Sequence, residues 1–144
     1  MDIALDPTLD CANAVVMAAF CKTALGYVDQ PPPAPSKTRA EWLASFGEPE
    51  GPEADGAWLR SPDGTGPRLS ILRVPEPKTA KNRLHIDIRV PGHRTDVERG
   101  ARARAGADRL RAAGATALDT ADGHHVVMAD PEGNEFCVGP GPRP

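Results

Sequence analysis

Residues 129–138, ADPEGNEFCV, predict a β-hairpin with a specific turn near the C-terminus. The residues just before them, 126–128, are β-branched and apolar, which is typical of a strand. In the turn, Asp130 can accept hydrogen bonds from the backbone ahead of it, Pro131 presets φ, and Gly133 supplies a positive φ. The chain then returns as a second strand.

Side chains of the returning strand alternate between two faces. Phe136 and Val138 are its apolar pair, so we expect them on the core face, together with Asn134. Glu135 and Cys137 then point to the opposite face. We expect these two side chains to line whatever space that face encloses.

The same hairpin pattern occurs earlier in the chain. Residues 58–64, WLRSPDG, resemble residues 126–133, VVMADPEG, and residues 68–72 follow as the returning strand. Each hairpin is preceded by a helix with a small-residue stop, and each helix is preceded by a strand, at residues 3–10 and 83–90. The chain is therefore predicted to contain two copies of strand, helix and three strands.

Two apolar stripes at helical spacing predict the helices. The first consists of Ala14, Met17, Ala18, Cys21 and Leu25, and it can be capped by Asp10 or Asn13. The second consists of Gly100, Ala103, Ala107 and Leu110, and it follows a capping-box pattern formed by Thr95 and Glu98.

The order of these motifs resembles the vicinal oxygen chelate superfamily, and within it the glyoxalase-like domains, which are relatives of glyoxalase I, extradiol dioxygenases and bleomycin resistance proteins. The residues that carry the resemblance are LDCAN at 9–13, ALGY at 24–27, KNRLHID at 81–87 and DPEGNEFC at 130–137. The resemblance covers nearly the whole chain. It implies an α+β fold in which two βαβββ modules form a curved, mixed β-sheet cup with helices outside. It also implies a homodimer, because members of this superfamily commonly pair.

The modules are predicted to form one glyoxalase-like domain, 1–144. Module one is residues 1–74, the extended polar linker is 75–82, and module two is 83–144.

Module one contains an insertion, residues 30–56, that has no counterpart in module two. A proline-rich run opens it, and Thr38 with Glu41 forms a capping-box pattern for a short helix through Phe46. One interpretation makes the insertion a lid, with Trp42 or Phe46 touching a ligand. In the other, it packs as a surface ornament. Both interpretations stay open.

Charge and composition exclude several classes of partner. The chain has 144 residues with 17 Lys and Arg against 20 Asp and Glu, and this slightly acidic balance does not support electrostatic binding of nucleic acid. Aromatic residues make up only 4%, so stacking platforms for single strands are also not expected.

The three cysteines are widely spaced and lack a Cys-x-x-Cys pair, which indicates neither a zinc ribbon nor a disulfide framework. We find no pattern of a signal peptide or of a transmembrane helix. A cytoplasmic protein without a membrane partner is therefore expected.

The resemblance also predicts where metal ligands would lie, because metal-using members of the superfamily place one ligand on each of four strands. Only two of the corresponding residues can bind a metal, whereas a competent site supplies three or four protein ligands. We therefore expect no metal ion and no other cofactor. An alternative cluster of His85, Asp87 and Glu135 with His124 or His125 stays open. The four family positions fall on Ile3, on Leu72 (or Ser70 in another alignment), on His85 and on Cys137.

Strand alternation at residues 83–90 places His85, Asp87 and Arg89 on one face, and Leu84, Ile86, Ile88 and Val90 in the core. The expected function is binding of a small polar or aromatic molecule in a metal-free cup. A metal-dependent lyase, isomerase or dioxygenase is the alternative. The expected ligand-binding residues are His85, Asp87, Glu135 and Cys137, with walls from Trp42 and Trp58.

Overall fold

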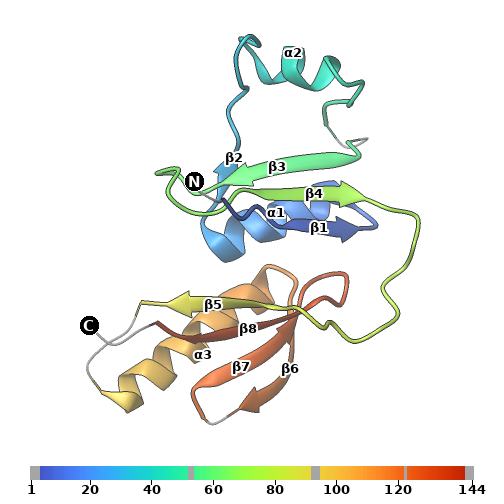
Figure 1. Ribbon diagram of the computed structural model, residues 1–144. Coiled ribbons are helices and arrows are strands. Elements are labelled where there is room, and N and C mark those ends of the chain that lie inside the picture. The colour runs from blue at the N-terminus through green and yellow to red at the C-terminus, as the bar shows by residue number, and fades with distance from the viewer. Residues whose placement is uncertain (1–3, 52–53, 92–94, 122, 142–144) are drawn as a thin grey trace. The chain divides into compact units, whose positions relative to one another are not determined.

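A computed structural model describes residues 4–51, 54–91, 95–121 and 123–141. It divides into two compact units, which we call unit one (residues 1–77) and unit two (residues 78–144). The division falls within the stretch expected to be a linker, 75–82. Figure 1 shows that each unit contains its own sheet and its own long helix.

Unit one contains a four-stranded mixed sheet in the order β1-β4-β3-β2. Strand β1 is parallel to β4, and the other pairs are antiparallel. Helix α1 begins after Asn13, whose side chain accepts a hydrogen bond from the Val16 N–H, and ends at Gly26, which has φ of 69°. The elements are β1 (Thr8–Cys11), α1 (Ala14–Leu25), β2 (Val28–Asp29), α2 (Arg39–Ala44), β3 (Gly56–Arg60) and β4 (Leu69–Arg73).

Unit two repeats this topology, with its four strands in the order β5-β8-β7-β6 and β5 parallel to β8. The predicted α+β fold with two βαβββ copies is therefore confirmed. Both expected capping boxes are present, at Thr38 with Glu41 before α2 and at Thr95 with Glu98 before α3. The elements are β5 (Ile86–Val90), α3 (Asp96–Ala112), β6 (Thr116–Ala121), β7 (His125–Ala129) and β8 (Glu135–Pro140).

Each unit buries one face of its sheet under its long helix. Helix α1 packs on β3 and β4, and α3 packs mainly on β7 and β8. The predicted apolar stripes supply the helix side of both cores, except that Leu25 is only half-buried. The largest side chains that are completely buried are Met17, Leu59 and Ile71 in unit one, and Leu110, Met128 and Val138 in unit two.

Strand β1 is shorter than the predicted strand at residues 3–10. Residues 1–3 lie outside the described chain, and residues 4–7 are not in a strand. Pro7 has no N–H to donate to a ladder, although its carbonyl accepts from the Ser70 N–H at 3.1 Å. Regular pairing with β4 therefore begins at Thr8, opposite Ser70.

The prediction that Leu84 and Ile86 belong to the core is wrong. Strand β5 begins at Ile86 instead of residue 83, and Leu84 and Ile86 are 86% and 45% exposed. Helix α3 approaches the other end of β5, where a Cβ built on Gly106 would lie 3.1 Å from Val90 Cγ2. This contact with α3 is at the last residue of β5, away from Leu84 and Ile86.

The turn between β7 and β8 is built as predicted. The buried carboxylate of Asp130 accepts hydrogen bonds from the N–H groups of Glu132 and Asn134, both at 2.9 Å, and from Asn134 Nδ2 at 2.8 Å. Gly133 has φ of 87° and donates its N–H to the Asp130 carbonyl at 3.0 Å. One carboxylate thus fixes the register with which β8 returns along β7.

Replacing Asp130 by Ala should lower the free energy of unfolding by about 1–3 kcal/mol, because partly buried donors lose their acceptor. Asp130→Asn keeps one acceptor oxygen for the two backbone N–H groups and should cost less. Urea unfolding of the two variants and the wild type measures this difference. Equal losses in the two variants would contradict the assignment of the turn's stability to these hydrogen bonds.

Candidate functional site

The face of the unit-two sheet opposite α3 carries most of the polar side chains of β5 and β8. The register pairs Asp87 with Cys137 and Ile86 with Phe136, so His85 adjoins Glu135. Phe136 and Val138 are buried on the α3 side, as predicted. We call the opposite surface the polar face, and it consists of His85, Asp87, Arg89, Glu135, Cys137, Gly139 and His125.

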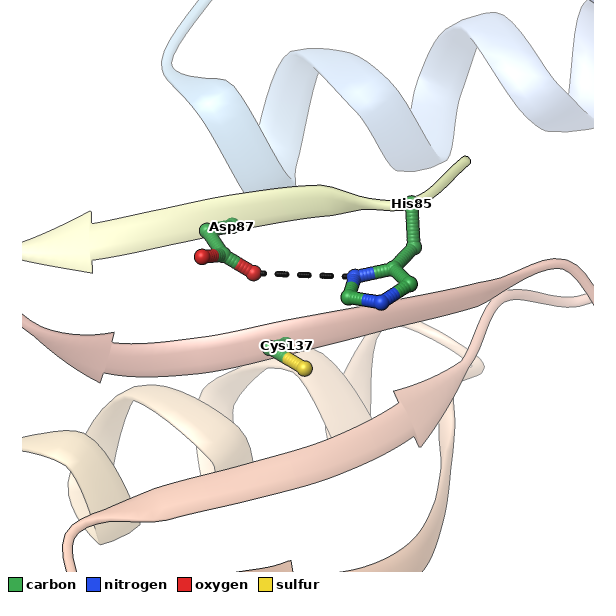
Figure 2. Close-up of side chains that lie close together, drawn as sticks. All are labelled: His85, Asp87 and Cys137. Carbon is green, nitrogen blue, oxygen red and sulfur yellow. Dashed lines mark ion pairs between the residues drawn. The ribbon is translucent and has the colours of Figure 1, made fainter. Parts of the chain in front are cut away.

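Three side chains of the polar face converge, as Figure 2 shows. His85 lies just before β5, and its Nδ1 is 3.7 Å from Oδ1 of Asp87. The thiol of Cys137 comes from the neighbouring strand β8, and one donor atom from each of the three residues lies within 4.8 Å of the others. Among the described residues this is the one group of three or more His, Cys, Asp or Glu side chains close enough to hold a metal ion.

The negative charge of Asp87 is neutralised by Arg89, which lies two residues further along β5. Arg89 Nη2 donates to Asp87 Oδ2 at 2.7 Å, and Arg89 Nη1 lies 3.3 Å from His125 Nε2. The His125 ring lies directly over Gly139, where a Cβ would overlap it. Glycine at this position therefore allows His125 to lie beside Arg89. His125 is in β7, and His124 lies just before this strand. Because its ring lies beside Arg89 and over Gly139, His125 is the histidine of this pair that we assign to the polar face.

Glu135 is paired with a residue of the chain that leads into β5. Its carboxylate forms an ion pair with Lys81, and its N–H donates to Asn82 Oδ1 at 3.2 Å. The hydrogen bond from Lys81 lowers the pKa of Glu135. Burial opposes this effect, and the charges of Lys81, Lys78 and His85 add to it. Of the two carboxylates in the expected cluster, Asp87 is the one that lies beside the His85 ring in the described chain.

Cys137 is half-buried between these charges. Burial, the negative charge of Asp87 and a hydrogen bond to Asp87 raise the pKa of the Cys137 thiol, and the charges of Arg89 and Lys81 oppose them only in part. The thiol is therefore protonated near neutral pH. A protonated thiol is a hydrogen-bond donor, not a nucleophile or a metal ligand.

These residues, as arranged, do not fit a resident divalent metal. Such an ion would have to compete with Arg89 for the Asp87 carboxylate and remove a proton from a thiol whose pKa is raised. The family positions in unit one offer few donor atoms of their own. Leu72 has no donor atom, Ser70 offers only a hydroxyl, and Ile3 lies outside the described residues.

Trp42 and Trp58, the expected aromatic walls, lie in unit one. Together with Phe46 they form an aromatic cluster, with ring centroids 5.4 Å apart for the two tryptophans and 5.2 Å for Phe46 and Trp58. Trp42 is on α2 and Trp58 is on β3, so the cluster attaches the insertion to its sheet. Helix α2 ends at Ala44, two residues before the predicted end, and Phe46 is 49% exposed.

Arg89 and Lys81, the cationic partners of the two carboxylates, were not among the expected site residues. Strand alternation already placed Arg89 beside Asp87, so its charge was a usable signal for the ion pair. Lys81 gave no such signal, because it reaches Glu135 only after β8 has paired with β5.

Comparison with known proteins identifies the family. The model of the glyoxalase-like domain family matches residues 6–139, so the chain belongs to this family. No protein of curated function matches the sequence. In the described parts of the chain, no helix has the length and apolar character needed to cross a membrane.

Solved structures with low sequence identity share the fold. A possible glyoxalase from Bacillus cereus has a TM-score of 0.60 at 14% identity, with 96% of this chain and 99% of that chain covered. The fosfomycin resistance protein FosX from Mesorhizobium loti has a TM-score of 0.65 at 12% identity, with coverage of 99% and 94%. FosX from Listeria monocytogenes, complexed with Mn(II) and sulfate ion, has a TM-score of 0.63 at 10% identity, with coverage of 99% and 94%.

Alkylation rates at neutral pH can test the electrostatics around Cys137. Asp87→Asn should increase the rate for Cys137 a few-fold, because it removes the negative charge that raises the thiol pKa. Arg89→Gln should decrease that rate, because the Arg89 charge lowers the same pKa. Brief iodoacetamide labelling followed by mass spectrometry measures both effects.

Buried Cys21, in helix α1, is the internal control and should label more slowly than Cys137 in every variant. Changes of the same sign in Asp87→Asn and Arg89→Gln would mean that access, and not charge, controls the reactivity of Cys137. Faster labelling of Cys21 would contradict the assigned strand and helix faces.

Proposed function

We propose that this glyoxalase-like protein binds a small polar or aromatic molecule at its polar face, without a metal ion. One observation carries the proposal: both carboxylates of the polar face already have a cationic partner. Arg89 pairs with Asp87, and Lys81 pairs with Glu135. A divalent cation would find no excess negative charge there.

Hydrogen-bonding groups remain for a neutral or zwitterionic ligand. The side chain of His85 is 47% exposed, and its imidazole can donate or accept according to its tautomer. The Cys137 thiol already hydrogen-bonds to Asp87, whose side chain is 41% exposed and whose carboxylate can accept a further hydrogen bond. Groups of this kind are costly to remove from water unless a ligand supplies matching partners, so the ligand we propose is polar where it meets the polar face.

The aromatic part of the proposal concerns Trp42 and Trp58. Both are half-buried in the cluster with Phe46, so each ring keeps surface that can meet solvent or a ligand. Contact of these tryptophans with a ligand stays a prediction, and in the described chain they attach α2 to β3. Homodimer formation and a cytoplasmic location also stay predictions, which light scattering and cell fractionation can check.

A metal-dependent lyase, isomerase or dioxygenase is the second candidate function. The observation that favours it is the convergence of His85, Asp87 and Cys137, whose donor atoms lie within 4.8 Å of one another. For such an enzyme the Asp87–Arg89 ion pair would first have to open. Metal binding and metal-free ligand binding therefore make opposite demands on the same side chains.

A thermal-shift comparison of wild type and His85→Ala separates the two functions. With zinc, nickel, manganese or iron added, we expect no specific rise in melting temperature, since a metal stabilises the folded state only where it binds. Leu84→Ala is the matched control, because Leu84 adjoins His85 and is 86% exposed. Metal stabilisation of wild type and Leu84→Ala that disappears in His85→Ala would refute the metal-free proposal.

The same three proteins can be screened against a small-fragment library by ligand-observed NMR. Polar and aromatic fragments should bind wild type and Leu84→Ala, and should bind His85→Ala about tenfold more weakly, which is the loss of one good hydrogen bond. His85→Ala should fold normally because its side chain lies outside both cores. Unchanged fragment binding in His85→Ala would show that the polar face is not the binding site.

A further inference from the structure

A second site is suggested by a hollow of about 300 Å³ in unit one. It lies between the proline-rich run that follows β2 and the turn that joins β3 to β4. Two arginines and one amide supply its charged and polar side chains, and no carboxylate lines it. The lining residues are Gln30, Pro31, Pro32, Pro33, Arg60, Gly64, Gly66 and Arg68.

Arg60, the last residue of β3, has no compensating charge among the described residues. It is half-buried, and its Nε is inaccessible to solvent and without a hydrogen-bond partner there. A Cβ on Gly64 would lie 3.3 Å from Arg60 Nη1, so the guanidinium rests against the turn. A partly buried charge without a partner is costly, and an anion in the hollow would remove that cost.

The nearby carboxylates are already occupied. Asp6 accepts hydrogen bonds from Nε, Nη2 and the backbone N–H of Arg68, and these contacts lower the pKa of Asp6. The Asp63 carboxylate accepts from the Thr65 N–H at 3.1 Å and from the Ser61 hydroxyl. Arg68 is therefore held in place by Asp6, and neither carboxylate forms an ion pair with Arg60.

The walls of the hollow are held in place before any ligand arrives. The Ser61 hydroxyl accepts from the Gly66 N–H at 3.0 Å, and the Tyr27 hydroxyl donates to the Pro67 carbonyl at 2.9 Å. A Cβ on Gly66 would lie 3.1 Å from the Tyr27 hydroxyl oxygen, so glycine there lets this hydroxyl approach the turn closely. Three consecutive prolines make the facing wall stiff, so little conformational entropy is lost on binding.

We propose that this hollow binds the phosphate group of a small molecule, or free phosphate, with Arg60 as the main contact. Guanidinium groups hold tetrahedral oxyanions through charge-assisted hydrogen bonds, which are stronger than hydrogen bonds between neutral groups. Gln30 can add an amide donor. All of the lining residues belong to unit one.

Titration of the ¹⁵N-labelled protein with inorganic phosphate, and separately with phenyl phosphate, tests the proposal at constant ionic strength. Amide signals of Gly64 and Gly66 should shift with saturation in wild type. Arg60→Gln should weaken binding about tenfold, which is the loss of one charge-assisted contact. The ligand that binds more tightly identifies the source of the phosphate group.

Arg73→Gln is the matched control, because it removes the same charge from the same sheet at a residue paired with Asp55. It should leave the titration unchanged. Gln30→Ala is a second test, which leaves the Arg60 guanidinium in place and should also weaken binding. The backbone at this position should be unchanged, because the N–H of residue 30 still donates to the Trp58 carbonyl. Equal weakening in Arg60→Gln and Arg73→Gln, or no saturable shift with either ligand, would overturn the proposal.

Discussion

Parallel pairing of β5 with β8 is the constraint on which the polar face depends. It sets Asp87 beside Cys137, although nearly all of unit two separates these residues in sequence. The connection between the two strands runs through α3, β6 and β7, and its last step is the turn held by Asp130. A slip of one residue at that turn would move Glu135 and Cys137 to the α3 side and put Phe136 and Val138 on the surface.

This pairing also explains why the polar face is electrically balanced. Arg89 pairs with Asp87 because both side chains are on the same face of β5, two residues apart. Lys81 lies in the chain that leads into β5, and it pairs with Glu135 on the neighbouring strand β8. The balanced charges leave hydrogen-bonding groups with no demand for a cation. Family membership alone does not decide between a metal-dependent enzyme and a metal-free binding protein, because one fold supports many functions. Our proposal of metal-free ligand binding rests on the charge partners of the two carboxylates.

Local chemistry made much of the fold predictable. The Asp130 turn, the two capping boxes and the helix stops use contacts between residues close in sequence, and strand alternation correctly separated Phe136 from Cys137. Features that depend on long-range packing were not predictable. The start of β5 depends on where α3 crosses the sheet, and the partner of Glu135 depends on the linker's path.

The unit-one hollow shows the same limit of sequence reasoning. The proline-rich run is evident in the sequence, but a run of prolines does not show which surface it faces. Only the folded chain sets it against Arg60 and the glycines of the β3–β4 turn. The aromatic cluster was half predictable: helical spacing related Trp42 to Phe46, whereas the contact of both rings with Trp58 needed the folded sheet.

The central claim, that the polar face is balanced without a metal ion, is tested most directly by the metal content of the protein. The protein should be purified without chelators from cells grown with added zinc, manganese, nickel and iron, and analysed by mass spectrometry of the elements. Our account predicts much less than one equivalent of any divalent metal per chain. One equivalent in wild type that is absent from His85→Ala protein would contradict it.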